Sequence, residues 1–374
     1  MRTARVIALA FALASAVVSP SQSQSVFNEF LLTHELHVKP TYRSWSSERG
    51  DRVYQSAVPI VYILPLTSAL ALDVSTAFGH SHLSNPSETI AAMSDTRVRA
   101  SLVTLDNMLL VSAGVIIPTG HAELRSDERI VAASLASPVL DFPVSFYGQG
   151  PGVTAGAAMA IDLDGAVLGL GLGTFLRGSF KPSAETDATY HPGNELTGLV
   201  GLETTFRLGS VGWRILGDID YTVYGTDTFG GTEVFRSGDR WMFNFQTEIR
   251  ARSYQVILFV QDRTKGKNER GLGTLLPEAV NTNGNQLDIW LDGTFPIGKN
   301  LNVRAYFESK LYANNDFGTN GATILGGGPG FEAQIARGLW VEAALKYFGG
   351  TLTFLNGETA ISGFHSDLAI RVQF

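Results

Sequence analysis

The last twelve residues, 363–374, alternate almost without interruption between apolar and polar side chains. The apolar set is Phe364, Leu368, Ile370, Val372 and Phe374. The polar set is His365, Asp367, Arg371 and Gln373. Successive side chains of a β-strand point to opposite faces, so this segment is expected to be a strand with one apolar and one charged face. Such a strand fits a soluble sandwich, or a membrane barrel with lipid outside and water inside. The terminal aromatic, with no polar tail after it, favours the barrel.

The same alternation recurs along the chain. In 241–249, Trp241, Phe243 and Phe245 share one face, and Asn244 and Gln246 lie on the other. A helix would spread such residues around its circumference at 3.6 residues per turn, whereas a strand sorts them onto two faces. Further segments of this kind are 70–78, 213–223, 287–295 and 301–311. Many alternating segments in one chain predict an all-β fold, namely a transmembrane antiparallel up-and-down β-barrel.

The composition agrees with a lipid-facing surface. Hydrophobic residues reach 44% and charged residues only 17%, whereas a soluble domain typically carries about a quarter charged residues. No apolar run of eighteen or more residues follows Val18, which excludes a transmembrane helix on length. Cysteine is absent, so disulfides and thiolate metal sites are excluded.

The N-terminal segment has the layout of an export signal. Arg2 and Arg5 precede an apolar stretch, 6–18, and small polar residues follow it. We therefore expect a Sec-type signal peptide over 1–23, cut somewhere within 16–25, and a barrel over 24–374 located in the bacterial outer membrane. The formal charge is −7, and without the two arginines it is about −9. No basic patch stands out, so nucleic acid is not an expected partner.

Tight and long connections are expected to alternate, as in outer-membrane barrels. Tight turns are expected near 67–68, 106–107, 164–165, 210–212, 251–252, 298–300 and 336–338. Long loops are expected near 46–53, 80–96, 118–145, 181–194, 226–239, 265–285, 314–324 and 352–361. Together they predict about sixteen strands, with both termini on the tight-turn side. Fourteen strands stays open, because the turn at Ala251 and the faces of 54–66 are ambiguous. A soluble periplasmic sandwich or propeller would explain the apolar–polar alternation within strands, but not the regular change between tight turns and long loops.

The polar faces predict the lining of an aqueous lumen. The expected lumen-lining residues are Gly169, Gly171, Gly173, Trp290, Asp292, Arg304, Tyr306, Glu308, Lys310 and Arg371. Most of the charged members are expected to pair across the wall, because confined charges need partners. The glycines leave room either for an inward-folded loop or for a smooth track along which an apolar solute slides. Inward aromatic side chains would offer stacking surfaces or simply fill a wide lumen.

The longest expected loop, 118–145, contains a helical pattern. Ser126 is a candidate N-cap, Asp127 and Glu128 follow in the first turn, and Pro138 is expected to end or bend the helix. Such a loop could either plug the pore or shield its rim, and the sequence leaves both open.

Two local motifs carry a family resemblance. The run Ile117-Pro118-Thr119-Gly120 precedes the long loop, and the glycine-spaced strand after it closes on 177–180, Arg-Gly-Ser-Phe. The chain resembles outer-membrane transport proteins, the superfamily of long-chain fatty-acid transporters and porin-like proteins linked to aromatic-compound degradation. The resemblance implies passive uptake of small hydrophobic molecules and recognition of the strand ending in Phe374 by the barrel-assembly machinery. Family transporters have fourteen strands and an N-terminal plug, whereas little chain here precedes a first strand near Leu32.

The expected function is therefore an outer-membrane channel that passively transports small hydrophobic or aromatic solutes. A general diffusion porin with mild cation preference is the alternative, given the acidic balance. A barrel hydrolase is disfavoured, because pairs such as His80-Ser81 and His365-Ser366 place the two side chains on opposite faces of a strand. No cofactor, metal or catalytic residue is expected. The expected partners are outer-membrane lipid, the assembly machinery and the solute, and the oligomeric state stays open.

Overall fold

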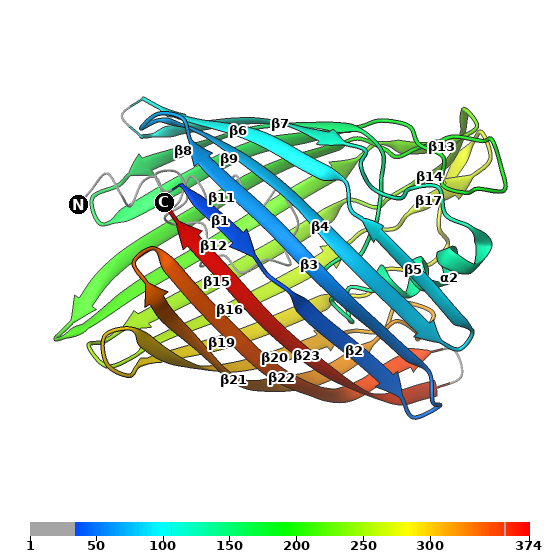
Figure 1. Cartoon of the computed structure of the whole chain (residues 1–374). Helices are drawn as coiled ribbons and strands as arrows, with labels where there is room; N and C mark the ends of the chain where they lie inside the picture. The colour runs from blue at the N-terminus through cyan, green and yellow to red at the C-terminus, as the bar shows by residue number, and fades with distance from the viewer. Residues whose placement is uncertain (1–33, 106, 355–356) are drawn as a thin grey trace.

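The computed structural model describes residues 34–105, 107–354 and 357–374. The expected signal peptide, Leu32 and Asp106 lie outside these ranges. The described chain forms a closed antiparallel β-barrel, as predicted (Figure 1). The strands of its wall are β1 (Glu35–Val38), β2 (Thr41–Ser47), β3 (Arg52–Pro65), β4 (Leu70–Ser84), β5 (Ser87–Met93), β6 (Thr96–Thr104), β7 (Leu109–Ile117), β8 (Gly152–Asp162), β9 (Ala166–Arg177), β11 (Glu195–Leu208), β12 (Val211–Tyr224), β15 (Arg240–Arg250), β16 (Gln255–Lys265), β19 (Gln286–Pro296), β20 (Leu301–Tyr312), β21 (Ala322–Ala336), β22 (Leu339–Phe354) and β23 (Gly357–Gln373).

Within the described residues, these 18 strands make 16 wall crossings. The alternation of tight turns and long loops in the sequence predicted this number. β1 and β2 both pair with β3 and β23, so they are two parts of one crossing. β5 and β6 both pair with β4 in the same way. The first interruption contains Pro40, which has no N–H to donate to a neighbouring strand.

The first and last strands close the wall. β1 pairs with β23 through Glu35↔Gln373 and Val38↔Ile370, and β2 continues the pairing from Thr41↔Asp367. Closure leaves neither the first nor the last strand with a free edge, which a membrane requires because lipid offers no hydrogen bonds. Among the described wall strands β5 differs, because its ladder partner is β4 alone.

The two faces of the wall differ sharply in exposure. In β15, Trp241 and Phe243 are 46% and 43% exposed, whereas the intervening Met242 and Asn244 are 3% and 7% exposed. The large apolar side chains therefore point outward and the polar ones inward, as the alternation predicted. In β3, the strand with ambiguous faces, the register places Ile63 inward and Tyr62 outward, because Ile63 pairs with the inward-facing Asp73.

One end of the barrel carries tight turns, and we call it the turn end; the other is the loop end. All seven predicted tight turns are present, including the uncertain one at 251–254 between β15 and β16. Both described ends of the chain lie at the turn end (Figure 1).

Three of the eight predicted long loops are wrong. Only residues 48–51, 85–86 and 355–356 separate the strands at these places, because β3, β4, β5, β22 and β23 extend beyond the length that lipid requires. Where both faces of a strand meet water, polar residues can stand on either face. His82 and Ser84 therefore continue the ladder without the apolar alternation that would show in the sequence where the strand ends. The other five long loops are present.

A smaller sheet covers part of the loop end. Its strands are β10 (Tyr190–His191), β13 (Thr226–Phe229), β14 (Thr232–Arg236), β17 (Glu269–Gly271) and β18 (Leu275–Pro277). They come from three consecutive long loops, which therefore form one folded unit above the wall. Figure 1 shows part of this unit at one side of the loop end.

The described helix is α2 (Ser126–Leu135), in the longest loop. The predicted N-cap is wrong by one residue, because Arg125 is the N-cap and Ser126 is the first helical residue. A carboxylate from the next loop serves this helix start instead: Glu185 accepts hydrogen bonds from the Ser126 backbone N–H (2.7 Å) and Oγ (2.9 Å). Hydrogen bonds from Ser183 and Ser126 lower the pKa of Glu185 to about 2. No helix in the described ranges is long and apolar enough to cross a membrane.

Candidate functional site: the barrel interior

The chain between α2 and β8 folds into the barrel. We call residues 136–147 the inward segment. It touches inward-facing side chains of widely separated strands: Arg43 and Trp45 of β2, Gln55 of β3, Ser81 of β4 and Lys310 of β20. One short segment can reach all of these strands only from inside. The long loop therefore narrows the lumen, which was one of the two roles left open.

A charged contact fixes the middle of the inward segment. Arg43 donates to Asp141 at 2.6 Å, and the Lys310 ammonium donates to the backbone carbonyls of Pro138 (3.4 Å) and Val139 (3.2 Å). Burial opposes ionisation of Asp141, but the charges of Arg43 and Lys310 outweigh it and hold its pKa well below the usual range. Asp141 is therefore an anion at neutral pH.

A neutral contact fixes the end of the segment. Gln55 is fully buried and makes a two-way amide pair: its Nε2 donates to the Val144 carbonyl, and the Val144 N–H donates to its Oε1, both at 2.9 Å. The hydroxyls of Ser81 and Tyr147 lie 2.7 Å apart beside it. A buried amide whose donor and acceptor are both satisfied specifies one position of the segment.

Apolar packing completes the attachment. Val131, Leu135, Val139, Phe142 and Val144 of the loop belong to one buried cluster with Trp45, Ile90, Ile324 and Phe348 of the wall. These wall residues face inward, where the composition of a water-filled lumen would be polar. These wall residues are apolar because the inward segment covers them and separates them from water.

The base of the loop is also closed. The Asp95 carboxylate, at the break between β5 and β6, accepts the Gly120 N–H at 3.0 Å and the Gln149 N–H at 2.7 Å. Asp95 thus holds the two ends of the loop close to each other at the wall.

The register places all the predicted lumen-lining residues on the inward face. Arg304 forms ion pairs with Asp292 and Glu342, and Lys346 forms one with Glu308. Arg371 lies 3.6 Å from Glu332. These charges pair along one side of the wall, so they give little net field there.

The predicted glycines lie on the opposite side. Gly169, Gly171 and Gly173 pair with Ala160, Ala158 and Gly156 of β8, respectively. On their other side they meet Gly201, Leu199 and Thr197 of β11. The structure thus forms a strip of small and apolar inward residues across β8, β9 and β11. The inward-facing Leu199 was not anticipated.

Inward aromatic side chains lie between these two sides. The rings of Phe259 (β16) and Trp290 (β19) are cross-strand neighbours with centroids 5.1 Å apart. Tyr306 lies two strands from Phe259, with the Lys346 ammonium 4.5 Å from its ring centroid. Aromatic faces of this kind bind other rings by offset or edge contacts.

Sequence reasoning missed several interior residues. Arg43 and Gln55, which hold the inward segment, were not identified, and neither was a group of cations at the loop end that includes Arg240 and Arg263. Their inward position follows from the alternation, but their importance depends on loops whose path the sequence does not reveal.

The Ser81–His80 and Ser179–His191 neighbours do not form a Ser–His–carboxylate triad within the described residues. Ser81 is fully buried and faces inward, while His80 is exposed on the outer face. The hydroxyl of Ser179 lies 3.2 Å from Nδ1 of His191, but this pair is exposed, and within the described residues no carboxylate is bonded to His191 to orient it. A Ser–His nucleophile needs that third group.

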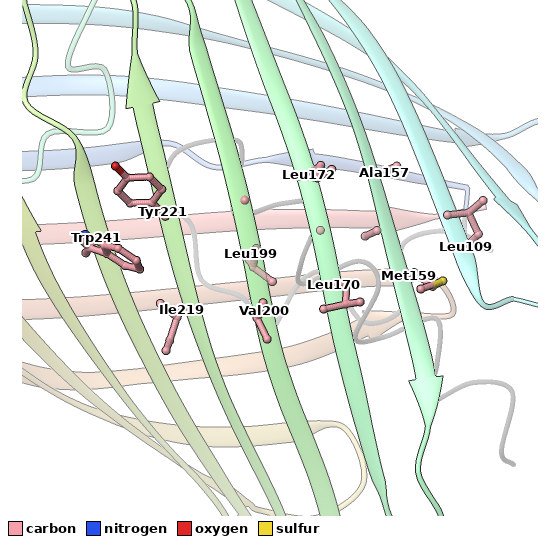
Figure 2. A pocket seen from close by; sticks show the side chains of 13 residues that line it. Leu109, Ala157, Met159, Leu170, Leu172, Leu199, Val200, Ile219, Tyr221 and Trp241 are labelled. Atoms are coloured by element: carbon pink, nitrogen blue, oxygen red, sulfur yellow. The ribbon is translucent and has the colours of Figure 1, made fainter.

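The outer face carries an apolar groove of about 670 Å³ on β7, β8, β9, β11, β12 and β15 (Figure 2). It arises because Ala157 and Gly198 lack bulk among larger outward residues. Those residues include Met159, Leu170, Leu172, Val200, Ile219 and Trp241. Its lining also includes Ala158, Gly171 and Leu199, so the groove lies against the outer side of the strip of small inward residues.

No family model matches the chain. No curated protein matches it either. Among solved structures, it is similar to outer-membrane protein OpdK of Pseudomonas aeruginosa, at 10% identity over 91% of this chain and 100% of that one, with a TM-score of 0.46. A mutant of the TodX monoaromatic hydrocarbon channel is 8% identical over 97% and 94% of the two chains, with a TM-score of 0.49. A mutant of the Rh. blastica porin is 16% identical over 91% and 99%, with a TM-score of 0.36. At these identities and TM-scores the likeness assigns no family to the chain. We therefore infer the function from the residues that line the barrel interior.

Proposed function

We propose that the protein is a passive channel of the bacterial outer membrane for small solutes that carry an aromatic or apolar group. The observation that supports this most is the Phe259–Trp290 pair, which faces the interior of a barrel that the inward segment narrows. A narrowed lumen that carries an aromatic surface and a strip of small apolar residues selects by ring contacts as well as by size.

The location in the outer membrane belongs to this proposal. The loop end would face the outside and the turn end the periplasm, as in bacterial barrels. Export by a Sec-type signal peptide over residues 1–23 is part of it. We also propose that the barrel-assembly machinery binds β23, whose terminal Phe374 ring lies 4.5 Å from the ring of His34.

Two alternatives make different predictions. A general diffusion porin would show no preference for rings, and the acidic composition would give it mild cation preference. Membership among the long-chain fatty-acid transporters is a finer proposal, and the 16 crossings of the described wall do not favour it, because that resemblance implied fourteen.

Uptake into proteoliposomes tests the proposed function. We expect radiolabelled L-phenylalanine at micromolar concentration to equilibrate faster than glucose, after subtraction of protein-free leakage. Trp290→Ala should reduce this preference by about two- to tenfold, the range expected for one aromatic contact. The matched control is Trp241→Ala, which removes an outward-facing indole. Equal rates for phenylalanine and glucose in the wild type would contradict the proposal.

A further inference from the structure

Four cations surround one inward tyrosine near the loop end. Arg177, Arg240 and Arg263 all act electrostatically on Tyr224, and the Lys265 ammonium lies 5.8 Å from its ring centroid. Arg240 and Lys265 are direct cross-strand partners. We call these five residues the Tyr224 cluster.

Among the described residues, three of these four cations form no direct ion pair. Arg177 forms an ion pair with Glu195, but within the described residues no carboxylate forms one with Arg240, Arg263 or Lys265. Arg240 donates to the neutral Thr222 hydroxyl at 3.2 Å. Arg263 donates to the neutral side-chain carbonyl of Gln261 at 3.4 Å. The Nε atoms of both arginines are buried without a hydrogen-bond partner.

Nearby carboxylates are bonded to other groups. Asp227 accepts from the Tyr190 hydroxyl and from the Gly193 N–H. Asp288 accepts from the Tyr312 hydroxyl at 3.1 Å. Asp220 accepts from Asn244 at 3.2 Å. A hydrogen bond from a neutral donor leaves a carboxylate its charge, and Asp220, Asp288 and Asp227 act electrostatically on Arg240, Arg263 and Lys265, respectively. None of these three carboxylates accepts a hydrogen bond from the cations, so the arginine N–H groups are not engaged by them.

Inward guanidinium groups whose N–H groups are not engaged by a carboxylate suit a solute carboxylate, which accepts two parallel hydrogen bonds from one arginine. Arg263 and Phe259 lie on the same face of β16, four residues apart, so about 13 Å of strand separates the cluster from the aromatic pair. A solute that leaves the cluster toward the turn end meets the Phe259 and Trp290 rings next.

We infer that the Tyr224 cluster binds the carboxylate of an anionic aromatic solute as it enters the barrel from the loop end. This inference rests on the proposed function and names its substrate class. It predicts that the channel prefers an anionic aromatic solute to a cationic one, because arginines without an ion-pair partner among the described residues line the path from the loop end.

Planar-bilayer recordings at pH 7.5 test the inference with three probes: benzoate, the permanently charged cation benzyltrimethylammonium, and gluconate. We expect a KCl gradient to give an anion-selective reversal potential. Benzoate added at the loop end should reduce the current at lower concentration than either other probe. In Arg240→Gln/Arg263→Gln the half-blocking benzoate concentration should rise by about fivefold or more, since each guanidinium contributes charge-assisted hydrogen bonds.

The matched control is Arg214→Gln/Glu203→Gln, which removes an inward arginine together with its ion-pair partner at 2.8 Å. It should leave benzoate block unchanged, and unheated gel mobility checks that each variant folds. Cation selectivity of the wild type, or equal block by benzoate and benzyltrimethylammonium, would overturn the inference while leaving phenylalanine preference over glucose intact. Equal block by benzoate and gluconate would overturn its aromatic part. Failure of the proposed function shows separately, as loss of that phenylalanine preference.

Discussion

Asp141 is the residue on which the position of the inward segment depends most. It is the anion that Arg43 holds, and the Lys310 ammonium acts on the same carboxylate. Removing its charge would leave a largely buried guanidinium without its ion-pair partner, which costs about 1–3 kcal/mol.

Asp141→Asn is therefore expected to loosen the inward segment. Single-channel recordings should show higher conductance and more current noise than the wild type. Asp187→Asn is the control, because Asp187 pairs with Lys181 at 2.8 Å on the exposed loop surface. Wild-type conductance in the Asp141 variant would contradict the role of this ion pair.

The low pKa of Asp141 also sets a pH dependence. A carboxylate whose folded pKa lies below its unfolded value stabilises the fold fully above about pH 4 and loses that contribution as the pH falls through the folded pKa. We expect steady conductance from pH 8 to about pH 4.5. Opening of the channel within that window, seen in pH-step recordings, would show that Arg43 does not hold the carboxylate.

Inward glycines are not equivalent. A Cβ at Gly326 would lie 2.2 Å from the Phe348 ring and 2.6 Å from the Tyr347 carbonyl oxygen, whereas at Gly171 the nearest atom is 3.6 Å away. Gly326→Ala should destabilise the barrel by about 1–3 kcal/mol through overpacking, and Gly171→Ala should be tolerated. The temperature at which the unheated gel band converts to the unfolded form measures both. Equal conversion temperatures would contradict this packing.

At this scale the sequence predicts the direction of a side chain but not its neighbours. Arg304 and Asp292 could be placed inward from alternation alone, yet their pairing depends on the register of β19 with β20. Gln55 could be placed inward as well, but nothing in its surroundings along the chain indicates that Val144, far along in sequence, binds it.

The longest loop is the element that turns a wide barrel into a narrow one. Its base is closed by Asp95, and Gly148 lies against Ala122 so closely that an added Cβ would be 2.7 Å from the Ala122 backbone nitrogen. The loop can therefore be shortened without moving β7 or β8.

Excision of residues 123–147, with Ala122 joined to Gly148, should leave the closed ladder intact and raise single-channel conductance several-fold. It should also remove the preference for phenylalanine over glucose in uptake, because a wide lumen holds no solute against Trp290. A control that replaces only the exposed residues 272–274, between β17 and β18, with a Gly/Ser linker should change neither quantity. Unchanged conductance after excision would mean that another segment sets the pore.

The sequence predicted strands correctly where contact with lipid requires a minimum strand length and an apolar outer face. The seven tight turns and the outer face of β15 and β20 follow from apolar alternation, which the membrane enforces. The alternation did not predict where β4, β5, β22 and β23 end, because strands that extend into water beyond the membrane can carry polar residues on both faces. The path of the inward segment depends on contacts with β2, β3 and β20, which adjacent residues cannot reveal.

At the scale of the whole molecule, the barrel divides lipid from water by one rule: in each described wall strand, alternate residues face opposite ways. The proposed channel, its aromatic surface and the Tyr224 cluster all require that the polar face encloses water. A soluble protein with the same alternation would instead bury its large apolar residues, such as Leu172, which is 67% exposed here.

Thiol labelling at adjacent positions tests this arrangement most directly, because the natural chain contains no cysteine. Val153→Cys and Leu291→Cys point outward, and their neighbours Thr154→Cys and Trp290→Cys point inward. In reconstituted membranes, the inward pair should react with a charged, water-soluble methanethiosulfonate and lower the conductance. The outward pair should react only with an apolar maleimide dissolved in the bilayer. Reaction of Val153→Cys and Leu291→Cys with the charged reagent, while Thr154→Cys and Trp290→Cys stay protected, would contradict the account.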